Sequence, residues 1–410
     1  MPKYTLYAFG SNGEGQLGIG NNHDTPRPTR VPFTSSLSGT NLLRITGGAN
    51  HTLIHLDHCG GTVYGAGSNQ YGQLEPSRID RLEKFRKLNQ RITLCAAAQN
   101  SSAFISNGNT KPNGNGRAML FGLGISEWGE LGPVVAAPEA YHEYGGWEPK
   151  KLFRFPTNVI DFAAGAWHYV AVLQDGQIWG WGKGRNGQLG RGRPDENLIP
   201  SELDPVDFQP VRVVCGKEFT YLVGDPVTGS HAILGDRPTI RRGIPENVPG
   251  WKQIGASWNA VFVLFDDGRL IGFGKENLWE LVPAGLPPID NIAVGACHVL
   301  ALTKAGNLLT WGWGEHGNCG LLDTERYPKN IVSGRWVELL PPPGNVQAIV
   351  TGASIGEISD EERGSLEGHT VLAVGAGAST SFVLLSEPSS AVGQAEGEAR
   401  QDSRDDEEET

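Results

Sequence analysis

Cysteine, charge and long apolar runs are all scarce in this sequence. Its five cysteines form no C-x-x-C pair and are odd in number, which argues against a disulfide framework or a zinc site and predicts buried thiols in a reducing compartment. No apolar stretch approaches the roughly 18 residues that cross a bilayer, and the N-terminus shows no basic segment followed by an apolar run. We therefore expect a soluble, unsecreted protein of the cytoplasm, with the nucleus as a second location.

Only 19% of the 410 residues are charged, and the formal net charge is −11. Residues 387–410 hold nine acidic residues and two arginines, a net charge of −7, which leaves −4 for residues 1–386. Acidic segments poor in aromatic residues do not form a core. The sequence thus predicts one nearly neutral folded domain over 1–386 and an acidic disordered tail over 387–410.

Glycine, by contrast, is abundant: 57 of 410 residues, about twice the usual share. There is no G-X-Y period, which excludes collagen. The glycines belong to a recurring phrase, first seen as Phe9-Gly10-Ser11-Asn12-Gly13-Glu14-Gly15-Gln16-Leu17-Gly18. We align its seven copies on the glycines at 10, 65, 122, 180, 235, 272 and 312, with a mean spacing of about 50 residues.

A second phrase alternates with the first: a small residue, two variable residues, often a histidine, and then alternating apolar residues. Its seven copies open at residues 48, 98, 165, 216, 256, 295 and 377. A repeat of this length, with alternating apolar residues and glycine turns, is typical of a four-stranded propeller blade. The sequence therefore predicts an all-β, seven-bladed β-propeller with four-stranded blades.

The order of the phrases predicts how the ring closes. The chain begins with the first phrase (Leu6 to Gly18) and ends with the second (Gly377 to Leu385). One blade must then contain strands from both termini, which removes the open sheet edges that invite aggregation.

These alternating phrases, from Leu6 to Leu385, resemble the repeats of the regulator of chromosome condensation family, whose members form seven-bladed propellers. The opening Tyr7-Ala8-Phe9-Gly10-Ser11-Asn12-Gly13 is similar to that of the fungal alpha-tubulin suppressor, or killer-toxin-insensitivity, proteins. That resemblance implies a heterodimer with the small zinc-binding diphthamide biosynthesis protein. It also implies a supporting role in Elongator-dependent tRNA wobble-uridine modification and in diphthamide synthesis on the translation elongation factor.

The family's founding activity, guanine nucleotide exchange on a Ran-type GTPase, is the alternative. A chromatin-bound exchanger would be expected to carry a basic tail for DNA phosphates, whereas residues 387–410 are acidic. Plant ultraviolet receptors of the family repeat Gly-Trp-Arg-His-Thr. This chain has Gly165-Ala166-Trp167-His168-Tyr169 instead, which argues against light sensing.

Sites for cofactors, metals and catalysis find little support. Residues 182–187 and 312–317 match G-x-G-x-x-G but fall on the repeat phrase, without the strand and helix of a nucleotide site, and no G-K-[ST] occurs. His51, His55, His58 and Cys59 lack the spacing of a metal site. His51 shares its repeat slot with His168 and His298, so we expect a backbone hydrogen bond within the blade. No catalytic constellation is recognisable. The sequence thus predicts no enzymatic activity, cofactor or metal.

Residues 77–91 combine six basic residues with apolar residues at three-residue steps, Ile79, Leu82, Phe85 and Leu88. This spacing predicts a helix capped by Ser77 and Asp80. Its basic side chains suit either a phosphate or RNA contact or, as we favour, a solvated inter-blade helix.

The second phrase also suggests a partner site. Two residues after its opening stand Asn50, Asn100, Trp167, Glu218, Trp258, Cys297 and Ser379, which equivalent blades would place around one mouth of the channel. Trp167 and Trp258 interrupt small or polar residues there. Core packing explains them equally well, but tryptophans are enriched in binding hot spots.

We hypothesise that a protein partner binds Trp167 and Trp258, with Glu218 as a polar contact and Asn50 and Asn100 nearby. Three insertions, at 106–117, 133–151 and 354–369, break the repeat, and Trp147 in the second suits an exposed arm. The protein alone is expected to be monomeric.

Overall fold

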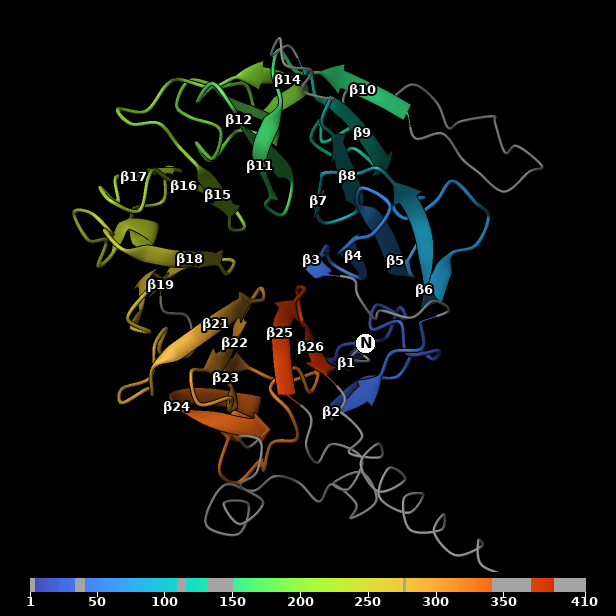
Figure 1. Cartoon of the computed structure of the whole chain (residues 1–410), viewed down its shortest axis with the longest axis vertical. Helices are drawn as coiled ribbons and strands as arrows, with labels where there is room; N and C mark the ends of the chain where they lie inside the picture. The colour runs from blue at the N-terminus through green and yellow to red at the C-terminus, as the bar shows by residue number, and fades with distance from the viewer. Residues whose placement is uncertain are drawn as a thin grey trace, which may run out of the picture.

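The computed structural model describes residues 4–33, 41–108, 116–131, 150–275, 278–340 and 370–386. Within these ranges seven antiparallel sheets surround a central axis, and one strand of each sheet lies nearest the centre (Figure 1). We count the strands of a blade from this innermost strand outward. The described helices are two short 3₁₀ turns, η1 (Pro238–Arg241) and η2 (Pro328–Asn330), and neither is long and apolar enough to cross a membrane. The predicted all-β, seven-bladed propeller is confirmed.

Blade 1 contains strands from both ends of the chain, in the order β2 (Thr25–Arg30), β1 (Tyr4–Gly10), β26 (Thr380–Ser386) and β25 (Thr370–Ala376). β1 and β26 pair without interruption, from Tyr4 opposite Ser386 to Gly10 opposite Thr380. The predicted closure of the ring is therefore confirmed.

Blades 2 to 4 follow in chain order and have four strands each. Blade 2 contains β3 (Asn41–Gly47), β4 (His51–Asp57), β5 (Thr62–Ser68) and β6 (Arg81–Gln90). Blade 3 contains β7 (Leu94–Ala97), β8 (Ser101–Ser106), β9 (Met119–Gly124) and β10 (Lys150–Arg154). Blade 4 contains β11 (Val159–Ala164), β12 (His168–Leu173), β13 (Ile178–Lys183) and β14 (Glu196–Glu202).

Blades 5 and 6 show three strands each in the described ranges, and blade 7 shows four. Blade 5 contains β15 (Arg212–Cys215), β16 (Thr220–Val223) and β17 (His231–Leu234). Blade 6 contains β18 (Trp251–Ala256), β19 (Ala260–Phe265) and β20 (Leu270–Gly274). Blade 7 contains β21 (Ile289–Val294), β22 (His298–Thr303), β23 (Leu308–Trp313) and β24 (Ile331–Leu340).

A glycine with positive φ closes the third strand of each blade. These glycines are Gly10, Gly67, Gly124, Gly182, Gly235, Gly274 and Gly312, with φ between +94° and +145°. Four glycines in the sequence alignment, at 65, 122, 180 and 272, stand two residues earlier, because the G-x-G pattern offers two columns. From Gly235 to Gly274 and on to Gly312 the spacing is only 39 and 38 residues, which leaves little room for an outer strand.

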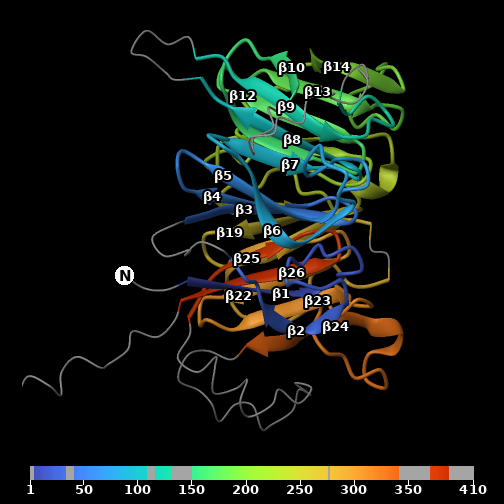
Figure 2. The same cartoon turned by 90° about the vertical axis from the view of Figure 1, so that its right-hand side faces the viewer.

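The loops that join first to second strands form a ring of backbone hydrogen bonds on one face of the propeller, which we call the tip face. Five of these bonds join neighbouring blades: Ala49 N to Gln99 O (3.1 Å), Gln99 N to Ala166 O (2.8 Å), Lys217 N to Trp258 O (3.0 Å), Trp258 N to Ala296 O (3.0 Å) and Ala296 N to Ala378 O (2.9 Å). Figure 2 shows the blades edge-on. β1 starts and β26 ends on the opposite face.

Small residues of the inner strands surround a central cavity of about 370 Å³. A Cβ on Gly47 would lie 2.7 Å from the Cα of Gly377, and one on Gly375 would lie 2.6 Å from Cδ1 of Ile45. Larger residues would force the inner strands apart, so these glycines serve close backbone approach.

The predicted helix over 77–91 is wrong, because residues 81–90 form the outer strand β6. Leu82, Phe85 and Leu88 are all buried although they stand three residues apart. Two register shifts in the pairing of β5 with β6 interrupt the two-residue alternation of the strand. The buried residues therefore stand three apart, a spacing that is also typical of a helix.

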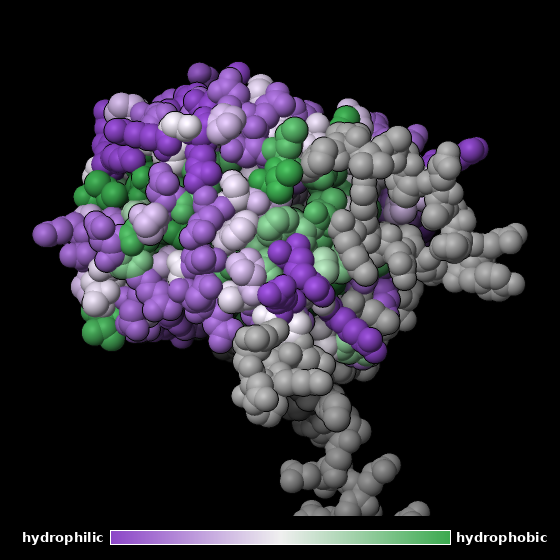
Figure 3. Space-filling view, turned by 90° about the horizontal axis from the view of Figure 1, so that it is seen from above, coloured by the Kyte–Doolittle hydropathy of each residue, from purple (hydrophilic) through white to green (hydrophobic). Residues whose placement is uncertain are grey.

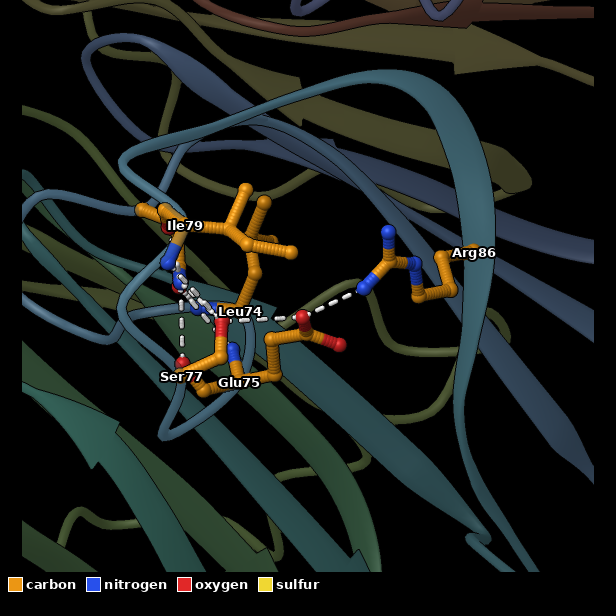
Figure 4. Close-up of polar contacts among 6 residues, drawn as sticks. Leu74, Glu75, Ser77, Ile79 and Arg86 are labelled. Carbon is orange, nitrogen blue, oxygen red and sulfur yellow. Dashed lines mark hydrogen bonds and ion pairs between the residues drawn. The ribbon is translucent and has the colours of Figure 1, made fainter. Parts of the chain in front are cut away.

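The loop before β6 is closed by its own polar groups (Figure 4). The Asn69 side chain donates to the Glu75 and Ile79 carbonyls at 2.9 and 2.8 Å and accepts from the Leu74 N–H at 2.9 Å. Glu75 Oε1 accepts from Arg86 Nη1 at 2.6 Å, which ties the loop to the strand.

The five cysteines are free thiols with different environments. Cys95 and Cys319 are buried, and burial raises the pKa of each thiol to about 12. Cys215 and Cys297 are half-buried, but Cys59 is exposed. The prediction of buried thiols is therefore wrong for Cys59, which occupies a turn with φ of 52°.

The rim seen in Figure 3 is largely hydrophilic, with apolar side chains in small groups. The acidic tail, the 354–369 insertion and Trp147 lie outside the described residues. So do residues 133–149 of the second insertion and most of the 106–117 insertion.

Candidate interaction site on the tip face

Three buried histidines join neighbouring blades beneath the tip face. Their Nε2 atoms contact hydroxyl oxygens of the next blade: His51 to Ser102 (3.0 Å), His168 to Thr220 (3.1 Å) and His298 to Ser381 (3.0 Å). The predicted bond within the same blade is therefore wrong. Burial lowers the pKa of His51 and His298 to about 4 and that of His168 to about 3.

Of the two histidines nearest Cys59, His58 is exposed and His55 is buried. His55 Nε2 lies 2.8 Å from the Ile92 carbonyl oxygen. Across the described ranges, no three His, Cys, Asp or Glu side chains are grouped so as to hold a metal ion.

Five of the seven predicted partner positions share one hydrogen bond of the repeat. The carbonyls of Asn50, Asn100, Trp167, Cys297 and Ser379 each accept a hydrogen bond from the residue after the positive-φ glycine. In blade 5 the residue after the positive-φ glycine, Asp236, donates instead to Asn186 O at 2.8 Å. In blade 6 the equivalent carbonyl belongs to Asn259, which accepts from Lys275 N at 2.9 Å.

Trp258 is therefore one position out of register with Trp167, and the sequence alignment is wrong there. The cause is a pair of small residues, Ala256 and Ser257. Ser257 N donates to Ala260 O, just as Gly165 N donates to His168 O, so Ser257 opens the phrase. Trp258 instead occupies the hydrogen-bonded ring around the channel, with 37% of its surface exposed.

Trp167 and Trp258 nevertheless belong to one cluster. The Lys217 ammonium lies 5.7 Å from the centre of the Trp167 ring and 5.0 Å from that of Trp258. Lys183 Nζ lies 4.3 Å from the centre of the same Trp167 ring and 5.0 Å from that of Trp128. We call Trp128, Lys183, Trp167, Lys217 and Trp258 the aromatic–cation ladder; it crosses blades 3 to 6.

Glu218 holds the cations at the middle of the ladder. Its Oε1 lies 3.5 Å from Lys183 Nζ, and its Oε2 lies 2.5 Å from Arg237 Nη2. The Lys183 side chain is only 4% exposed, so its charge depends on this carboxylate and on the two indole faces. Glu218 thus acts from within the site, as the anchor of two cations.

The polar positions at the edge extend the site toward blade 3. Asn100 Nδ2 donates to Glu127 Oε1 at 3.0 Å, next to Trp128. Asn50 is exposed in blade 2, outside the ladder.

Four important residues escaped the sequence analysis: Trp128, Lys183, Lys217 and Arg237. Aligning the first phrase on Gly10, Gly67, Gly124 and Gly182 would have found two of them. Trp128 takes the slot of Glu14 and Tyr71, and Lys183 takes that of Ser11. Lys217 and Arg237 carry no comparable signal, since single basic residues in loops are common.

Comparison with known proteins agrees with this architecture. Models of the regulator of chromosome condensation (RCC1) repeat match residues 5–54, 159–188, 175–223 and 289–318. An RCC1 repeat-containing protein of Schizosaccharomyces pombe is 26% identical over 384 residues, covering 87% of this chain and 99% of its own. A secretion-regulating guanine nucleotide exchange factor of Bos taurus is 26% identical over 330 residues, covering 77% of this chain and 64% of its own.

Among solved structures, Prp20p of Saccharomyces cerevisiae superposes with a TM-score of 0.64 at 17% identity, covering 95% of this chain and 92% of its own. The chain is thus a seven-bladed propeller, and RCC1-repeat models match parts of blades 1, 2, 4, 5 and 7.

Proposed function

We propose that this propeller is a non-enzymatic scaffold that binds a protein partner through the aromatic–cation ladder. The observation that carries the proposal is the ladder itself, in which three tryptophans and two lysines from different blades converge on one face. Tryptophan anchors are enriched in binding hot spots, and a closed ring of sheets is a rigid platform for them.

The energetics favour a binding role over a packing role for this cluster. Lys183 is buried and already paired with Glu218, so its charge is compensated within the fold. Trp258, at 37% exposed, leaves much of an apolar ring in water. A partner that covers the Trp258 ring would remove this apolar surface from water, which favours binding.

The partner that we propose is the small zinc-binding diphthamide biosynthesis protein, bound as a heterodimer. Through it the propeller would support Elongator-dependent tRNA wobble-uridine modification and diphthamide synthesis, in the cytoplasm and also in the nucleus. The support is the likeness of Tyr7 to Gly13 to the fungal proteins of that role, together with a face suited to one partner.

The test is a titration calorimetry measurement with the purified zinc protein. Replacing both Trp167 and Trp258 by alanine should weaken binding more than about tenfold, because two hot-spot rings are lost. Trp313→Ala is the matched control, a half-buried tryptophan on the tip face of blade 7. Affinity of the double variant within about twofold of the parent would remove the ladder from the binding site.

The second candidate is nucleotide exchange on a Ran-type GTPase, favoured by the similarity to an exchange factor over 330 residues. Capture of partners from extract, read by mass spectrometry, separates the two. The zinc protein with Elongator subunits supports the first candidate, and a nucleotide-free GTPase supports the second.

A further inference from the structure

We infer that the aromatic–cation ladder recognises an acidic segment of the partner, whose carboxylates pair with Arg185, Lys217 and Arg237. The inference rests on the proposed function and adds the chemistry of the bound segment. It starts from an imbalance of charge: the ladder and its edge carry four cations, Lys183, Arg185, Lys217 and Arg237, but two carboxylates, Glu218 and Glu127. Glu218 pairs with Lys183 and Arg237, and Glu127 accepts from Asn100.

Two of these cations have an aromatic neighbour but no ion pair. Arg185 is exposed, with its guanidinium carbon 5.1 Å from the centre of the Trp128 ring. Lys217 lies over both Trp167 and Trp258. Within the described residues no carboxylate forms a salt bridge with either. Indole faces hold the two charges in place and leave their hydrogen-bond donors open to an incoming anion.

A small cleft of about 20 Å³ lies at the end of the ladder, lined among others by Lys217, Glu218, Arg237, Thr239 and Trp258. Its size suits a carboxylate group or a single water. One wall is the partly exposed Trp258 indole, which can pack against the methylene groups of a Glu side chain. Glu218 already shows the geometry, since its carboxylate bridges Lys183 and Arg237.

The acidic tail of this chain is a less suitable occupant than a partner. β26 ends at Ser386, opposite Tyr4, on the face away from the ladder. The tail's six most closely spaced acidic residues lie between positions 402 and 409, so they would have to pass over the rim to reach blades 4 to 6. A segment supplied by another molecule meets no such constraint.

The test uses the full chain and fluorescence anisotropy with a fluorescein-labelled hexaglutamate peptide, and hexaglutamine as the uncharged probe. We expect hexaglutamate to bind at least about tenfold more tightly at low salt and to lose affinity as salt screens the charges. Lys217→Met and Arg237→Gln should each weaken hexaglutamate about fivefold or more. Lys304→Gln, a lysine in a turn on the opposite face, is the charge-matched control.

Equal binding of the two probes, or equal losses in Lys304→Gln and the ladder variants, would overturn the inference. So would tighter probe binding after the tail acids 402–409 are changed to amides, because the tail would then be the occupant. Thermal unfolding of each variant separates lost binding from lost folding.

The outcomes also distinguish this inference from the proposed function. If hexaglutamate shows no preference while the tryptophan double variant still loses the zinc protein, the scaffold proposal stands without acidic recognition. If the preference is found but the zinc protein binds the double variant normally, the ladder recognises acidic segments and the proposed partner contact is elsewhere.

Discussion

Blades 2 and 4 carry the same repeat but use its tip-face loop differently. After Gly67, blade 2 continues with Ser68, Asn69 and Gln70, and the loop closes on its own polar groups. After Gly182, blade 4 has Lys183 and Arg185 in the slots of Ser68 and Gln70. Both lie over Trp128 of blade 3, and Lys183 also lies over Trp167 of its own blade. Polar residues at these repeat positions close the loop within blade 2, whereas the long basic side chains of blade 4 extend to a neighbouring blade.

The contrast extends to two halves of the ring. Blades 7, 1 and 2 hold the chain closure and contain the aromatic core around Phe382, whereas blades 3 to 6 carry the ladder. We therefore expect stability and binding to separate: substitutions in the closing half change unfolding, and substitutions in the ladder change affinity.

The largest expected effect is in the closing half. Phe382→Ala removes a fully buried ring that packs edge-on against Phe85, with ring centres 6.2 Å apart, and should lower the free energy of unfolding by about 3–5 kcal/mol. Urea unfolding measures the loss, and Phe382→Leu should lose less. Partner affinity of the folded variant should stay within about twofold; a tenfold loss would show that the halves are coupled.

Acid should weaken both halves together, because the histidine contacts occur in blades 2, 4 and 7. The folded pKa values of about 3 to 4 lie below the ordinary 6.5. Stability is therefore complete above pH 6.5 and falls as the pH drops toward 4, since only unfolded chains take up the protons. Each histidine contributes a slope of about 1.4 kcal/mol per pH unit to the free energy of unfolding, so the three together contribute about 4 kcal/mol per pH unit.

The measurement is urea unfolding between about pH 4.5 and 7. His298→Asn should reduce the slope of stability against pH by one group's share. An unchanged slope in this variant would mean that His298 takes up its proton in the folded state.

The smallest expected effect concerns Glu130, in the Trp128 loop. Its carboxylate accepts from Trp128 N at 2.7 Å, where blades 1, 2 and 4 use glutamine: Gln16, Gln73 and Gln188 accept in the same way. Burial raises the pKa of Glu130, so its contribution to stability is lost as the pH rises through that folded pKa.

Glu130→Gln should therefore stabilise the protein by up to about 1 kcal/mol near pH 8 and have less effect near pH 5. Thermal unfolding at the two pH values is the measurement. A destabilised variant at pH 8 would mean that the charge itself holds the Trp128 loop, in contrast to the neutral glutamines of blades 1, 2 and 4.

The repeats made the fold predictable, because seven copies of two phrases determine both blade number and closure. Two local predictions were wrong because the same sequence pattern is compatible with two structures. Bulges placed Leu82, Phe85 and Leu88 at a helical spacing within a strand, and adjacent small residues concealed the register of Trp258.

The site was only partly predictable. Trp167 and Trp258 could be found because the other copies of the phrase have small or polar residues in that column. The roles of Lys217 and Arg237 are evident only from the tryptophan rings and the Glu218 carboxylate beside them. Such contacts join blades that are distant in sequence, so no spacing rule reports them.

The ring of backbone hydrogen bonds around the channel sets a limit on how the ladder can respond to a ligand. Trp258 takes part in it twice, donating to Ala296 and accepting from Lys217. A shift of its main chain would break bonds to two neighbouring blades at once. Binding at this face should thus proceed by side-chain rotation over a fixed backbone, and the entropy lost on association should be confined to the rotamers of a few residues.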